Sequence, residues 1–94
     1  MANLNVLTKL QACIDDYLVR TGKQQINEME ANSELARQGL MADDEKQPGE
    51  PLRQLLAMLR DTNLLPRNIR QNLGSWRIRN SHAFQTRQQI AFFF

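Results

Sequence analysis

The 94 residues are enough for one domain with a single hydrophobic core, and we expect residues 1–94 to form that domain. One cysteine excludes an internal disulfide, no motif resembles a four-ligand metal site, and no apolar run approaches the roughly 18 residues of a membrane span. With no signal-peptide pattern at its start, the chain is expected to be cytoplasmic, without cofactor or metal.

The formal net charge is +2, but the charges are distributed unevenly along the chain. Residues 1–46 contain 5 Lys+Arg and 8 Asp+Glu, for a net charge of −3, whereas residues 47–94 contain 7 and 2, for a net charge of +5. No acidic residue follows Asp61, although five arginines do: Arg67, Arg70, Arg77, Arg79 and Arg87. Such an asymmetry indicates a surface that faces an anion, and ordinary solubilising side chains are the simpler alternative.

The segment from Asn3 to Arg20 has the spacing of an amphipathic helix, which Gly22 is expected to end. Its apolar residues recur every three or four positions: Val6, Leu7, Leu10, Cys13, Ile14, Tyr17 and Leu18. This wide stripe predicts packing against the rest of the chain or against the same helix of a second chain. Cys13 is interpreted as a small core residue.

A second helix is predicted to begin at Asn27, with Glu30 three positions later in a capping-box arrangement, and to run to Gly39. Its expected buried residues are Met29, Leu35, Ala36 and Leu40. Residues 41–49 then predict a loop, since they combine a charge cluster with Pro-Gly. The acidic run 43–45 lacks the ligand alternation of a calcium loop and is interpreted as solvated.

A third helix is predicted to start with Pro51 at its first position and Glu50 beside the positive end of its dipole. Its buried stripe consists of Leu52, Leu55, Leu56 and Leu59. The other side carries Arg53, Gln54, Ala57 and Arg60, and arginine and glutamine are residue types that contact phosphates and base edges in DNA.

Residues 68–79 have the pattern of a β-hairpin. Pro66 disfavours a continuing helix, and two alternating runs, 68–71 and 76–79, follow with Gly74 between them to supply a positive φ. The alternation places Ile69, Trp76 and Ile78 on an inward face and Arg70, Arg77 and Arg79 on an outward one. The alternative is a short helix from Arg67 to Leu73 that presents Arg67, Asn68, Arg70 and Gln71.

Residues 83–94 are loosely consistent with a helix that packs on the core or on a partner. Three aromatic residues at the chain end, Phe92, Phe93 and Phe94, favour burial in the core or in a dimer contact. His82 has no carboxylate or cysteine close in sequence and is interpreted as a loop or first-turn residue.

The order of these segments over residues 26–82 resembles the excisionase and MerR-type winged helix. The matching parts are Glu30-Ala31 with Leu35-Ala36, the helix from Leu52 to Arg60, Leu65-Pro66, and the run from Gly74 to Arg79 with its Trp-Arg-Ile. The family joins its two helices by a short turn, whereas about ten residues separate Gly39 from Glu50 here. The resemblance implies a mainly α, winged helix-turn-helix-like fold with a small β-hairpin, to which residues 1–22 add an amphipathic helix.

The resulting hypothesis is a small accessory or regulatory protein that binds double-stranded DNA and has a role such as transcription regulation. The residues expected to bind DNA are Arg53, Gln54, Ala57, Arg60, Arg67, Arg70, Gln71, Arg77 and Arg79. A homo-oligomer, such as a dimer, is expected through the N-terminal helix or Phe92, Phe93 and Phe94. The alternative is a protein-interaction module or obligate oligomer whose arginines face an acidic partner. No enzyme is expected, because no histidine or carboxylate is placed for acid–base work.

Overall fold

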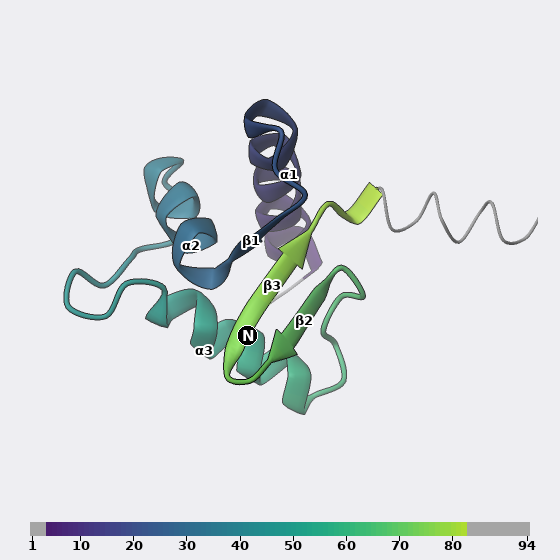
Figure 1. The fold of residues 1–94 in the computed structure, drawn as a ribbon. Helices are drawn as coiled ribbons and strands as arrows, with labels where there is room; N and C mark the ends of the chain where they lie inside the picture. The colour runs from purple at the N-terminus through teal and green to yellow at the C-terminus, as the bar shows by residue number, and fades with distance from the viewer. Residues whose placement is uncertain (1–3, 83–94) are drawn as a thin grey trace, which may run out of the picture.

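The structure is a computed structural model that describes residues 4–82 of the chain. These residues form a small α+β domain of three helices and a three-stranded antiparallel sheet. In Figure 1, α3 crosses behind β2 and β3, while α1 stands near the upper end of the sheet and α2 lies to its left. In chain order the elements are α1 (Leu4–Thr21), β1 (Gln25–Asn27), α2 (Glu28–Arg37), α3 (Glu50–Asp61), β2 (Ile69–Asn72) and β3 (Ser75–Arg79).

The first helix forms where its apolar spacing predicts it. Leu10, Ile14 and Leu18 of α1 are buried, and Leu7, Cys13 and Tyr17 are partly buried against the same core. Val6, which the spacing places in the stripe, is 43% exposed, so the buried stripe is narrower than expected. Gly22 follows the helix with a φ of 71°, and the N–H of Lys23 donates to the carbonyl of Leu18, which closes the helix end.

The predicted cap of the second helix is confirmed, and the expected buried face is confirmed in part: Leu35 is buried and Ala36 is partly buried, whereas Met29 and Leu40 are exposed. The Asn27 side chain accepts a hydrogen bond from the N–H of Glu30 at 2.8 Å. The buried residues are at positions 28, 31, 32, 34 and 35, which places Met29 outside that face, 46% exposed. Leu40 is also exposed, because α2 ends at Arg37 and position 40 no longer belongs to a helical face.

The segment between α2 and α3 is the predicted loop, and a buried amide anchors both of its ends. Asn32 of α2 has no exposed surface. Its Nδ2 donates to the carbonyl of Ala42, and its Oδ1 accepts from the N–H of Leu52 in the first turn of α3. Within the loop, the acidic side chain of Asp43 accepts from the N–H of Gly49 at 3.0 Å. These bonds set where α3 begins.

The third helix has the predicted first turn and buried stripe. Gly49 is its N-cap with a φ of 87°, and Glu50 and Pro51 follow in the first turn. The buried leucines are Leu52, Leu56 and Leu59, with Leu55 partly buried.

The predicted hairpin is confirmed, and the alternative short helix over residues 67–73 is wrong, because residues 69–72 are a strand. The strands extend further than expected, so the connection is only the two residues Leu73 and Gly74. Ile69, Trp76 and Ile78 are buried on the inward face, as the alternation predicts.

A third strand was not expected from the sequence. Residues 25–27 pair antiparallel with β3, with Ile26 opposite Ile78, and give the strand order β1-β3-β2. Where β1 ends, the buried carboxylate of Glu28 accepts the N–H of Trp76 at 2.6 Å. The Glu28 side chain thus provides the hydrogen-bond acceptor for β3 at the position where the backbone of β1 no longer does.

Residues 83–94, including Arg87 and the three terminal phenylalanines, lie outside the described residues. The predictions made for them are therefore not addressed by the structure. Among residues 4–82, no helix combines the length and apolar character that crossing a membrane requires.

Candidate functional site

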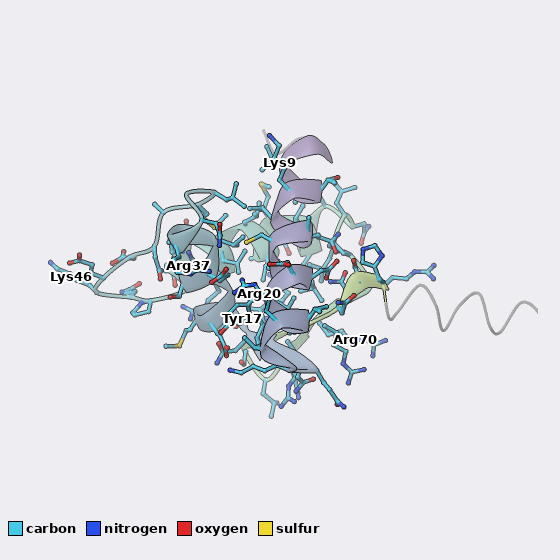
Figure 2. The ribbon with its side chains drawn as sticks, turned by 90° about the horizontal axis from the view of Figure 1, so that it is seen from above. Lys9, Tyr17, Arg20, Arg37, Lys46 and Arg70 are labelled. Carbon is cyan, nitrogen blue, oxygen red and sulfur yellow. The ribbon has the colours of Figure 1, made fainter. Side chains whose placement is uncertain are left out.

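The outward face of the sheet gathers three of the predicted binding residues. Arg70 and Arg77 are direct partners across β2 and β3, and Arg79 lies two residues further along β3 on the same face. We call Arg70, Arg77 and Arg79 the arginine face. All three side chains are exposed. In Figure 2, Arg70 points away from the body of the domain on the side opposite Lys9, and Lys46 lies far from both on the 41–49 loop.

The arginine face has amide neighbours but, within residues 4–82, no acidic partner. Asn27 and Gln25 of β1 stand opposite Arg77 and Arg79, respectively. The ion pairs of the described residues include none with Arg67, Arg70, Arg77 or Arg79. Like charges directly opposite each other on two strands are destabilising. The described residues therefore leave these arginines without an acidic partner, and the cross-strand pair of Arg70 and Arg77 is expected to cost some stability.

The predicted residues of α3 are in a different electrostatic state. Arg53 is ion-paired with Glu50 at 2.5 Å and lies 3.6 Å from the buried carboxylate of Glu28. Gln54 is exposed, and its Nε2 donates to the other oxygen of Glu50 at 3.4 Å. Ala57 is partly buried against the core. This flank of the helix thus has its cation partly neutralised by acids of α2 and α3.

Arg60 connects α3 to the hairpin on the inward side of the sheet. Its Nη1 donates to Oε1 of Gln71 at 2.6 Å, and its guanidinium lies 5.9 Å from the centre of the Trp76 ring. It also forms an exposed ion pair with Asp61. Since Gln71 is the register partner of Trp76, this contact lies on the sheet face away from the arginine face.

The nine predicted residues therefore do not form one continuous group. Arg70, Arg77 and Arg79 share the outward sheet face. Arg60 and Gln71 instead join α3 to the other face of the sheet, and Arg53 is paired with acids of α2 and α3. Arg67 is exposed in the turn that precedes β2.

Sequence reasoning missed the amides that border the arginine face. Gln25 and Asn27 join it only because residues 25–27 add a strand to the hairpin. The available signal was the alternation Gln25-Ile26-Asn27, in which the middle residue is apolar, but three residues are too few for a reliable strand pattern. Glu28, which connects Trp76 and Arg53, gave no signal beyond being an acid in a first helical turn.

The shifted pKa values belong to a separate group between α1 and α2, where Figure 2 places Tyr17, Arg20 and Arg37. A hydrogen bond from Arg37 is the largest cause that lowers the pKa of the buried Glu34 to about 2, and Arg20 contributes a further bond. Burial raises the pKa of the Cys13 thiol, in keeping with a core position. These groups stabilise helix packing and are not part of the arginine face.

The only histidine of the sequence lies near a serine and an aspartate, and the histidine and the serine contact the same carboxylate. Ser81 donates both its N–H and its hydroxyl to the buried carboxylate of Asp15, which ties the end of β3 to α1. His82 approaches the same carboxylate at 3.8 Å. The serine hydroxyl thus donates its hydrogen to a carboxylate, which differs from the serine–histidine pair of a hydrolase triad. Among the described residues, no cluster of His, Cys, Asp and Glu could hold a metal ion.

Comparison of the whole chain with protein-family models, with curated proteins and with solved structures gives no match.

Proposed function

We propose that this protein is a small, non-catalytic accessory or regulatory protein that binds double-stranded DNA in the cytoplasm through a winged-helix-like domain. The observation that carries the proposal is the arginine face: three exposed arginines on one sheet surface, without an acidic partner among residues 4–82. The hairpin β2-β3 acts as the wing, and α3 as the helix beside it.

Phosphate is the ligand that best suits this surface. Arg70 and Arg77 repel each other across the strand pair, and a bound anion would remove that repulsion. The guanidinium group offers a rigid fork of donors that fits phosphate oxygens, and the neighbouring amides of Asn27 and Gln25 can donate to phosphate or sugar. Contacts of this kind position a protein on DNA without reading its sequence.

A duplex suits the face better than a single strand. Proteins that bind single strands without sequence preference stack bases on exposed aromatic side chains. The only tryptophan, Trp76, is 1% exposed and points to the core, and the described part of the arginine face presents no aromatic ring. The arginine face is therefore suited to contacts with the sugar-phosphate backbone of a duplex rather than to stacking with unpaired bases.

The helix α3 contributes less base readout than its sequence suggests. Arg53 and Arg60 are engaged by Glu50, Glu28 and Asp61, so a base contact by either arginine must replace an existing ion pair. Gln54 is the exposed residue with amide donors and acceptors on this helix. We expect sequence-tolerant binding, strengthened by homo-oligomers through α1 or through Phe92, Phe93 and Phe94.

The test is a fluorescence-anisotropy titration of labelled duplex DNA with the full chain at several salt concentrations. If Arg67, Arg70, Arg77 and Arg79 each neutralise one phosphate, the slope of log K against log salt is about −4. The double variant Arg70→Ala/Arg77→Ala should reduce the magnitude of that slope by about 2 and weaken binding to all sequences alike.

The matched control is Lys9→Ala/Lys46→Ala, which also removes two exposed positive charges that have no ion pair among residues 4–82. Both lysines lie away from Arg70 (Figure 2). We expect its salt slope to equal that of the wild type. Equal losses in the two double variants would show that only net charge matters, and no binding to any duplex between about 50 and 200 mM salt would remove the proposal.

A further inference from the structure

The tip of the hairpin contains a residue that its backbone does not favour. Leu73 and Gly74 are the whole connection between β2 and β3, with φ values of 51° and 82°. A two-residue connection with both φ values positive favours Asn-Gly or Asp-Gly, because a leucine side chain is strained in this left-handed region. Leu73 is one of two residues other than glycine with positive φ in residues 4–82, the other being Asn63.

Solvation disfavours the same side chain. Leu73 is 100% exposed, more than any other large apolar residue in the described part of the chain. It is therefore not part of the core that residues 4–82 form. A residue that is unfavourable both for the turn and for water indicates a contact made outside residues 4–82, since strained residues concentrate at functional positions.

The surroundings of the tip indicate DNA as the partner in that contact. The residues next to the turn are the polar Asn72 and Ser75, and the first charged residues behind them are the arginine pair 70 and 77. Leu73 lies three residues beyond Arg70, so it projects about 10 Å further along the strand direction. The minor groove of B-DNA is about 7.5 Å deep. When the arginines reach phosphates at the edge of the groove, the leucine reaches the base pairs at its floor.

We propose that Leu73 is an apolar wedge that the hairpin inserts into the minor groove, where it unstacks a base step and bends the duplex. Apolar side chains such as leucine can part a base step from this groove and kink the helix axis. The inference rests on the proposed DNA binding and adds how the DNA is engaged. Because Gly74 supplies the second positive φ and has no side chain, Leu73 is the only residue of the two-residue connection with a side chain that could enter the groove.

The experiment compares the full-length wild type with Leu73→Asn and Leu73→Met on a duplex of about 30 base pairs that contains central TA steps, which kink readily. Fluorophores at the two ends report bending by energy transfer, and 2-aminopurine at a TA step reports unstacking. For the wild type we expect a rise in both signals. Leu73→Asn should abolish both rises with the salt slope unchanged and affinity reduced by less than about tenfold, because the phosphate contacts remain. Leu73→Met should retain both rises.

Three outcomes would overturn the wedge. Bending and unstacking by Leu73→Asn equal to those of the wild type would show that the leucine is not inserted, and so would wild-type binding without either signal. Light scattering in which Leu73→Asn turns an oligomer into a monomer, with bending unchanged, would assign the leucine to contact with a second copy. In all three, the arginine-dependent salt slope still stands, whereas loss of all duplex binding by the wild type would overturn both proposals.

Discussion

Reversal of one charge on the arginine face separates the stability of this domain from its proposed function. Arg70 and Arg77 are direct register partners, so Arg70→Glu replaces a repulsive cross-strand pair by an attractive one. Two exposed unit charges about 7 Å apart in water interact by about 0.6 kcal/mol, and the reversal changes the sign, for a gross gain of about 1.2 kcal/mol. Ordering of two long side chains offsets part of that gain.

We therefore expect the free energy of unfolding to rise by about 0.5–1 kcal/mol at low salt, which for a domain of this size raises Tm by about 2–8 °C. The gain should largely disappear in about 1 M salt, because exposed charges are then screened. The measurements are thermal and urea unfolding at both salt concentrations. The same substitution should weaken duplex binding by at least about tenfold and reduce the magnitude of the salt slope by about 1.

Two control variants accompany this substitution. Arg70→Gln removes the repulsion without adding an attraction, so we expect roughly half of the stability gain. Lys9→Glu changes the net charge by the same amount on the side of the domain away from Arg70 (Figure 2) and should leave DNA binding close to that of the wild type. An Arg70→Glu variant that is no more stable than Arg70→Gln at low salt, and that binds DNA as the wild type does, would refute the view that the sheet tolerates repulsion for the sake of an anion.

Two further predictions concern the packing of α2. Gly49→Ala should lower the free energy of unfolding by about 2–4 kcal/mol in urea titration, because φ is 87° and an added Cβ would lie 2.9 Å from Cα of Met29. At Gly39 φ is 75°, but an added Cβ would meet no atom within 4 Å, so Gly39→Ala should lower the free energy of unfolding by only about 1 kcal/mol. Equal losses in the two variants would contradict the close approach of Gly49 to Met29. Because Arg37 is the largest cause that lowers the pKa of Glu34 from 4.5 to about 2, the ionised carboxylate favours the folded state: its contribution is complete above about pH 4.5 and is lost as the pH falls toward 2. Glu34→Gln should therefore flatten the fall of the urea midpoint over that range, and an unchanged slope would contradict this assignment.

The local features of the domain could be predicted from short stretches of sequence. The cap at Asn27, the end of the first helix at Gly22 and the start of α3 at Gly49-Glu50-Pro51 depend on residues within one or two turns of each other. The hairpin and its inward and outward faces also follow from strand periodicity, since its two strands are joined by only two residues. For that reason the arginine face was predictable as a set.

Contacts between segments distant in the chain determine which of the predicted arginines have an acidic or amide partner among residues 4–82. Periodicity places Arg53 and Arg60 on the open flank of α3, but Glu28, 25 residues earlier in the chain, approaches the first, and Gln71 of the hairpin binds the second. The three-residue strand β1 forms because it pairs with the edge of β3 and because Ile26 lies opposite Ile78. No short window of sequence contains both partners of this interaction. Pairing between distant segments depends on where the fold brings them together. The fold therefore determines which exposed arginines are neutralised by a partner.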